Sequence, residues 1–487
     1  MLQRVHKSLE GNFVSKRQKL IAALRAEKVS SIAFIFIIAI ALMFLTLTWV
    51  AALADSPDGV TTDSGARTAI IAICSTFIIS LMFGRAEIWG PSCLKFVPII
   101  GTGGFLLAAA ALFASEKLDW AFALYGGFQV LRAEMLFSDM SWVLNWFECD
   151  FCERWDPHYG PTLAWLEPLS LGTIGNSFLL AASIALIVLG IGALLYLAKL
   201  SSPLGKWLIA VASISPAWLL LVDRANSDLI VFLCAVAGLW VVNRFPNLLT
   251  WALFASALWF VGTIKFYPFA IGITLLFALR IRHGWTIIAG FVVATALYMI
   301  LAWESYLDSS RWTVRPDLFL GDFPYYSRTF IEDRITGGDP STLVSLGVFV
   351  GLSLLLAAGA VIGFGVKTPQ WNQHRQSLIG SLALAGGIAF SGKVLWAGFG
   401  FMYTGVFLLM IIPVLSVMAD SRNRRNGIML GMALFGVFAL FAAYSTTLAT
   451  MSGIIFSGFG LGFGLKALMC HITDQESQPD ISARHQS

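Results

Sequence analysis

The chain has 487 residues, of which 57% are hydrophobic and 12% charged, and its mean hydropathy is +0.78. This composition excludes a water-soluble globular protein of that length. The formal net charge of +4 does not indicate a nucleic-acid partner, because the basic residues fall mostly where cytoplasmic loops are expected. The sequence therefore predicts an all-α polytopic membrane protein.

Six apolar runs approach or exceed the roughly 20 residues that cross a bilayer as a helix. They cover residues 31–54, 97–114, 169–198, 287–303, 343–366 and 394–418. Eight shorter runs are further candidates, at 67–83, 207–222, 229–242, 251–264, 266–279, 377–390, 428–444 and 448–468. Together they predict about 14 transmembrane helices within one domain, residues 31–469.

The distribution of basic residues predicts the orientation of these spans. Residues 1–30 contain seven Lys or Arg residues and two Glu residues, so this segment should be cytoplasmic. Alternation from there places the basic loops on the same side and residues 470–487 in a cytoplasmic tail. We therefore expect a multi-pass protein with both termini in the cytoplasm.

Two long loops, 115–168 and 304–340, then fall outside, and such loops often carry function. The first contains Cys149 and Cys152, which fit a local disulfide, free thiols, or a metal or redox pair. The second contains three arginines and two tyrosines, and either closes over an acceptor or forms a solvated cap; they are Arg311, Arg315, Arg328, Tyr325 and Tyr326. A structural cap over the bundle is also open for the first loop.

Three short polar clusters, 223–228, 265–268 and 391–393, interrupt the apolar sequence between stretches that are short for membrane spans. Charges at membrane depth are costly and often mark a functional cavity. Arg224 and Lys265 would then be recessed cations able to bind a phosphate group. Arg224 could instead pair with a neighbouring aspartate, Asp223 or Asp228.

Residues of these clusters, Trp396, and residues of the segment 153–159 near the predicted membrane boundary are candidates for substrate binding. Aromatic rings pack on sugar faces and polar groups bind sugar hydroxyls, although Trp and Tyr also populate the membrane interface and Lys393 also fits a snorkelling lysine. The candidates are Arg154, His158, Tyr159, Asn226, Asp228, Tyr267, Lys393 and Trp396.

The motifs Asp-Arg-Ala-Asn-Ser-Asp-Leu at 223–229 and Ile-Lys-Phe-Tyr-Pro at 264–268 resemble signatures of bacterial GT-C membrane glycosyltransferases related to the polyprenol-phosphate-mannose-dependent mannosyltransferases. Segments 159–169, 391–396 and 403–413, and the region that follows Asp119, are also similar to that family. The chain departs from it in two spans before residue 85 and in Tyr-Gly-Pro where the family has Tyr-Pro-Pro.

The resemblance implies a GT-C-like fold and inverting transfer of a sugar from a polyprenyl-phosphate donor at the outer face of the bacterial cytoplasmic membrane. An aspartate would act as general base, with Asp119 as the first candidate and Asp156 as the second. If the two additional spans belong to the common core, the rivals are Asp55, Asp58 and Asp63. Arg224 and Lys265 would bind the donor phosphate.

The partners implied are a polyprenyl-phosphate sugar, a lipid or glycan acceptor and membrane lipids. The sequence indicates no cofactor and no dedicated metal site. A secondary transporter or lipid-linked glycan flippase is the main alternative, because it too combines broken helices with recessed charges. A polysaccharide polymerase or ligase would use the same lipid-linked chemistry.

Overall fold

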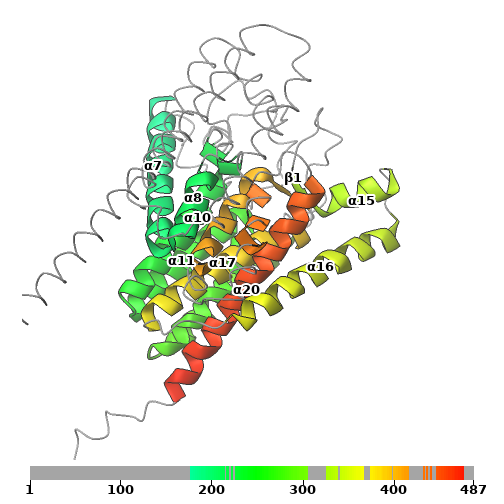
Figure 1. The fold of residues 1–487 in the computed structure, drawn as a ribbon. Helices are drawn as coiled ribbons and strands as arrows, with labels where there is room; N and C mark the ends of the chain where they lie inside the picture. Colours follow the sequence, from blue (N-terminus) through cyan, green and yellow to red (C-terminus); the bar gives the residue numbers. More distant parts are fainter. Residues whose placement is uncertain are drawn as a thin grey trace, which may run out of the picture.

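A computed structural model of the chain describes residues 176–304 (except 214, 216, 219–220 and 223–224), 325–337, 341–366, 373–396, 399–415, parts of 431–440, and 446–476. This part is almost entirely helical (Figure 1). Predictions for residues 1–175, including the first three spans and the first outer loop, lie outside the described residues.

Seven of the described helices are long and apolar enough to cross a membrane. They are α7 (Asn176–Leu200), α10 (Ser227–Arg244), α11 (Leu248–Lys265), α13 (Gly284–Leu301), α16 (Thr342–Gly365), α17 (Gln373–Trp396) and α20 (Thr446–Glu476). The helical fold class is therefore confirmed for this part of the chain, and its apolar helices are compatible with a multi-pass membrane protein. An 18-residue helix such as α10 rises about 27 Å, close to the thickness of a bilayer's hydrocarbon core.

The outer helices of the bundle present large apolar side chains to their surroundings. Leu189 on α7, Ile300 on α13 and Leu343 on α16 are each more than half exposed. Such surfaces suit lipid rather than water. Helix α17 is instead mostly buried, and Figure 1 shows it in the middle of the bundle beside α20, with α7 and α16 on opposite flanks.

Glycines allow α16 and α20 to approach closely. Gly359 and Gly363 of α16 lie against backbone carbonyls of α20, while Gly458 and Gly462 of α20 lie against carbonyls of α16. A Cβ atom on Gly462 would overlap the carbonyl oxygen of Ala360. This is the small-residue packing by which membrane helices associate when water does not drive them together.

Two short apolar segments are wound largely as 3₁₀ helix. Helix α12 (Pro268–Ile271) continues into η8 (Gly272–Arg280), and η10 runs over Met402–Val414. Because a 3₁₀ helix rises about 2.0 Å per residue, the 13 residues of η10 extend over about 26 Å, against about 20 Å for an α-helix. A short segment can thereby cover most of the membrane thickness.

Several expected boundaries are wrong. Residues 394–418 do not form one span, because α17 ends at Trp396 and strand β2 (Phe399–Phe401) separates it from η10. Helix α17 also extends beyond the run at 377–390, so Lys393 lies in its last turn. At the run predicted over 207–222, helix α8 (Pro203–Ala212) begins earlier, at Pro203. Helix α20 continues beyond residue 469 to Glu476.

Strand β1 (Tyr325–Ser327) pairs antiparallel with β2, with Tyr325 opposite Phe401 and Ser327 opposite Phe399. Helix α15 (Arg328–Thr336) follows β1 directly and leads towards α16. The end of the second predicted outer loop is therefore attached to the connection between α17 and η10.

Replacement of Gly462 by Ala should destabilise the protein, because the added methyl group meets a backbone carbonyl that cannot rotate away. The expected loss is about 1–3 kcal/mol in the free energy of unfolding, as for other overpacked sites. Gly351→Ala on α16 is the control, since nothing lies within 4 Å of the position that its methyl group would take. Equal unfolding midpoints of the two purified variants in detergent would contradict this packing.

Candidate functional site

A cluster of polar side chains joins four helix ends inside the bundle. We call it the Asp228 cluster, and its members are Asn226, Asp228, Lys265, Tyr267, Lys393 and Thr404. These residues come from the start of α10, the end of α11, the turn before α12, the end of α17 and the start of η10. The three polar interruptions of the sequence thus meet in space.

Asp228 is shared by two lysines. Lys265 Nζ lies 2.8 Å from Asp228 Oδ1, and Lys393 Nζ lies 2.6 Å from Asp228 Oδ2. The Tyr267 hydroxyl also donates to Oδ1, at 3.0 Å. Both carboxylate oxygens are therefore engaged, and the carboxylate side chain is fully buried.

The charges suit the helix ends on which they lie. Asp228 is in the first turn of α10, where the helix dipole favours a negative charge. Lys265 and Lys393 are in the last turns of α11 and α17, where it favours positive charges. Asn226 caps α10 by accepting a hydrogen bond from the backbone N–H of Asp228 at 2.8 Å.

Lys393 has further partners around its ammonium group. It donates to Thr404 Oγ1 at 3.2 Å and lies 4.9 Å from the centre of the Tyr267 ring, within cation–π range. The Tyr267 ring packs edge-on against buried Phe407 of η10. Lys393 is only 13% exposed, so the prediction of a snorkelling interfacial lysine is wrong.

Strained backbone flanks the cluster. Ala225 has φ of +45° and precedes Asn226, while Phe266 has φ of +56° and precedes Tyr267. Non-glycine residues rarely adopt this left-handed region, and where they do the surroundings must hold them there. Phe266 is buried against Tyr298, which supplies that packing.

The structure brings together five of the residues predicted to bind substrate or phosphate: Asn226, Asp228, Lys265, Tyr267 and Lys393. Trp396 lies at the end of α17 with 83% of its surface exposed. The predicted base candidates Asp119 and Asp156 lie outside the described residues. So do Arg224, Arg154, His158 and Tyr159, and the cysteines Cys149 and Cys152.

Sequence reasoning missed Thr404, which is buried and bonded to Lys393. A single threonine in an apolar run gives no signal of its own, because threonine also occurs in membrane helices bonded to its own backbone. Thr263 and Thr274 do this in α11 and η8. The pairing of Asp228 with two lysines distant in sequence was also not predicted, since the partner considered for Asp228, as an alternative, was the neighbouring Arg224.

The arrangement can hold two ammonium groups at a fixed spacing just inside the bundle. Lys265 is 11% exposed, so both cations are recessed rather than solvated. Preplaced cations of this kind stabilise an anion, or negative charge that develops during a reaction, without reorganising. Among the described residues, no group of His, Cys, Asp and Glu side chains has the arrangement of a metal site.

Comparisons of the chain with protein-family models, with curated proteins and with solved structures find no match.

Replacing Asp228 by Leu should cost about 3–5 kcal/mol of stability, because it leaves two buried lysines without their shared carboxylate. The triple variant Asp228→Leu, Lys265→Met, Lys393→Met should recover most of this loss, since apolar groups of similar size fill the same space. Denaturant unfolding in detergent micelles measures both. A triple variant no more stable than the single one would show that uncompensated charge is not the cause.

Proposed function

We propose that this chain is a GT-C-type membrane glycosyltransferase that transfers a sugar from a polyprenyl-phosphate donor to a lipid or glycan acceptor, with inversion. The donor phosphate binds at the Asp228 cluster. The observation that carries this proposal is the convergence of Lys265 and Lys393, from two separate helices, on one carboxylate.

The position of the cluster suits a lipid-linked phosphate. The phosphate of a polyprenyl chain lies where the hydrocarbon core ends, and the cluster lies at the ends of apolar helices α10, α11 and α17. As the glycosidic bond breaks, the leaving phosphate gains negative charge. Two cations that are already in place lower the energy of that transition state more than that of the bound donor.

Asp228 is not suited to be the general base. Its two oxygens accept bonds from two ammonium groups and a phenol, and its side chain is buried, so an acceptor hydroxyl has no access to it. The base in this proposal remains an aspartate of the first outer loop, Asp119 or Asp156, as the resemblance of the sequence implies. Asp228 instead fixes the spacing of the lysines.

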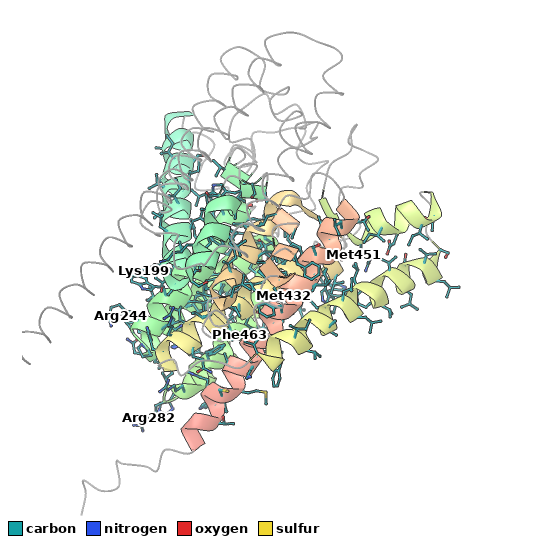
Figure 2. All side chains as sticks on the ribbon, in the orientation of Figure 1. Lys199, Arg244, Arg282, Met432, Met451 and Phe463 are labelled. Atoms are coloured by element: carbon teal, nitrogen blue, oxygen red, sulfur yellow. The ribbon has the colours of Figure 1, made fainter. Side chains whose placement is uncertain are left out.

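The basic residues at the opposite end of the bundle support an outward-facing cluster. Arg244 ends α10 at the end remote from Asp228, and Figure 2 shows it with Lys199 and Arg282 along the same end. Cytoplasmic ends of membrane spans are enriched in Lys and Arg. In this orientation the cluster faces the outer side of a bacterial cytoplasmic membrane.

Lys265→Gln and Lys393→Gln should each weaken binding of a polyprenyl phosphate, because each loses a charge-assisted hydrogen bond. The expected loss is about 10- to 100-fold in affinity. Titration of undecaprenyl phosphate into nanodisc-embedded protein measures it. The matched control is Lys466→Gln, which removes a partly buried lysine bonded at 2.6 Å to the carbonyl of Val366, outside the cluster.

Equal affinities of the cluster variants and wild type, with all proteins folded by their unfolding midpoints, would refute the phosphate site. Lys393→Arg keeps the charge and should retain more affinity than Lys393→Gln. This comparison separates loss of charge from loss of packing.

Transfer of radiolabelled sugar from a panel of polyprenyl-phosphate sugars tests the reaction itself. Asp119→Asn and Asp156→Asn are compared with wild type, because removal of the general base should lower turnover by about 10²- to 10⁴-fold while leaving donor binding intact. Loss in one variant alone would identify the base. No turnover with any donor and acceptor extract, alongside intact phosphate binding, would overturn the enzyme proposal.

A secondary transporter or lipid-linked glycan flippase is the alternative supported by a specific observation. The Asp228 cluster is built from charges on three different apolar helices, as transport sites often are. Proteoliposomes that move a fluorescent polyprenyl-linked glycan between leaflets, without cleaving it, would favour this function.

A further inference from the structure

Arg328 links the second predicted outer loop to the Asp228 cluster. It is the first residue of α15, directly after β1, and its Nη1 donates to the backbone carbonyl of Leu395 at 3.2 Å. Leu395 lies in the last turn of α17, two residues after Lys393. The last carbonyls of a helix have no partner within the helix, and a cation there also complements the helix dipole.

Two further contacts fix the Arg328 side chain. Its Nε lies 3.1 Å from Oε1 of Glu332, one helical turn later, and its guanidinium lies 5.9 Å from the ring centre of Phe349 on α16. The Glu332 side chain is 3% exposed and that of Arg328 is 27% exposed. These two atoms do not meet hydrogen-bond geometry, so the contact is electrostatic, and removing Arg328 would leave the buried Glu332 carboxylate without this cation.

The strand pairing adds a second attachment on the same segment. Strand β1 ends immediately before Arg328, and its partner β2 ends immediately before η10. Thr404, the third residue of η10, accepts a bond from Lys393. The segment from β1 to α15 thus contacts the end of α17, which carries Lys393, and pairs with β2, which leads directly into η10 and its Thr404.

We propose that Arg328 is a positioning residue for Lys393. By fixing the last turn of α17, it sets the distance of the Lys393 ammonium group from Asp228 and Thr404. The segment from β1 to α15 thereby affects the affinity of the cluster for an anion. The identity of that anion as the donor phosphate rests on the proposed function, whereas the mechanical coupling does not.

Hydrogen–deuterium exchange of Arg328→Gln tests the coupling without any ligand. The variant should exchange backbone amides in the last turn of α17 and in β2 faster than wild type, because α17 loses its bond to Arg328 and β2 is paired with the strand that leads into this residue. Arg375→Gln is the matched control, since Arg375 makes the same kind of contact at the other end of α17, donating at 3.2 Å to the carbonyl of Leu200. Unchanged exchange in β2 and the last turn of α17 in Arg328→Gln would overturn the proposal.

Titration of undecaprenyl phosphate then tests the consequence for the site. Arg328→Gln should weaken its affinity about three- to tenfold, as expected for the loss of one hydrogen bond, and Arg328→Lys should recover part of it. Arg375→Gln should leave the affinity unchanged. If Lys393→Gln loses affinity and Arg328→Gln does not, Arg328 does not position Lys393, although the phosphate site stands.

If Lys393→Gln itself leaves phosphate affinity unchanged, the proposed function fails and the ligand is not a polyprenyl phosphate. The exchange experiment then decides the coupling alone. Faster exchange confined to the last turn of α17 and to β2 in Arg328→Gln supports it, and exchange equal to that of wild type refutes it.

Discussion

The site depends on two ion pairs, which the Asp228 carboxylate makes with the ammonium groups of Lys265 and Lys393. Burying Asp228 alone would cost several kcal/mol, so it requires Lys265 and Lys393, and each lysine at this depth requires the carboxylate in turn. Because the three residues lie on α10, α11 and α17, their ion pairs hold the ends of these three helices together. The dipoles of all three helices favour these charges at these helix ends, which lowers the free-energy cost of burying them.

The rest of the bundle provides a stiff frame for this contact. Helix α20 lies between α16 and α17, and glycines on both sides let the backbones touch, as Gly462 does with α16 and Gly387 of α17 does with Ser457. Close packing of this kind leaves little room for α17 to rotate or slide. Lys393 is therefore carried on a central, buried helix, while the lipid-facing apolar surface is left to α7, α13 and α16.

The sequence predicted the membrane class, most described spans and the polar residues of the site, because long apolar runs and rare intramembrane charges are strong local signals. It did not predict the partners of Asp228, since the pairing joins residues 37 and 165 positions apart in the chain. The prediction of one span over 394–418 was wrong for a related reason. Hydropathy records apolar length but not the break after Trp396 or the 3₁₀ winding of η10.

The packing around the cluster bears on whether it serves catalysis or transport. A transporter must expose its site to each side in turn, so the helices that build the site have to move relative to one another. Here α17 is packed through glycines, its last turn is bonded to Arg328, and β1 and β2 attach the adjoining loop. Preorganised charges are of most use to an enzyme, because a transition state gains nothing from cations that must first be brought into place. In the proposed function, the cluster, with both oxygens of Asp228 engaged, supplies preplaced positive charge and leaves proton transfer to another group.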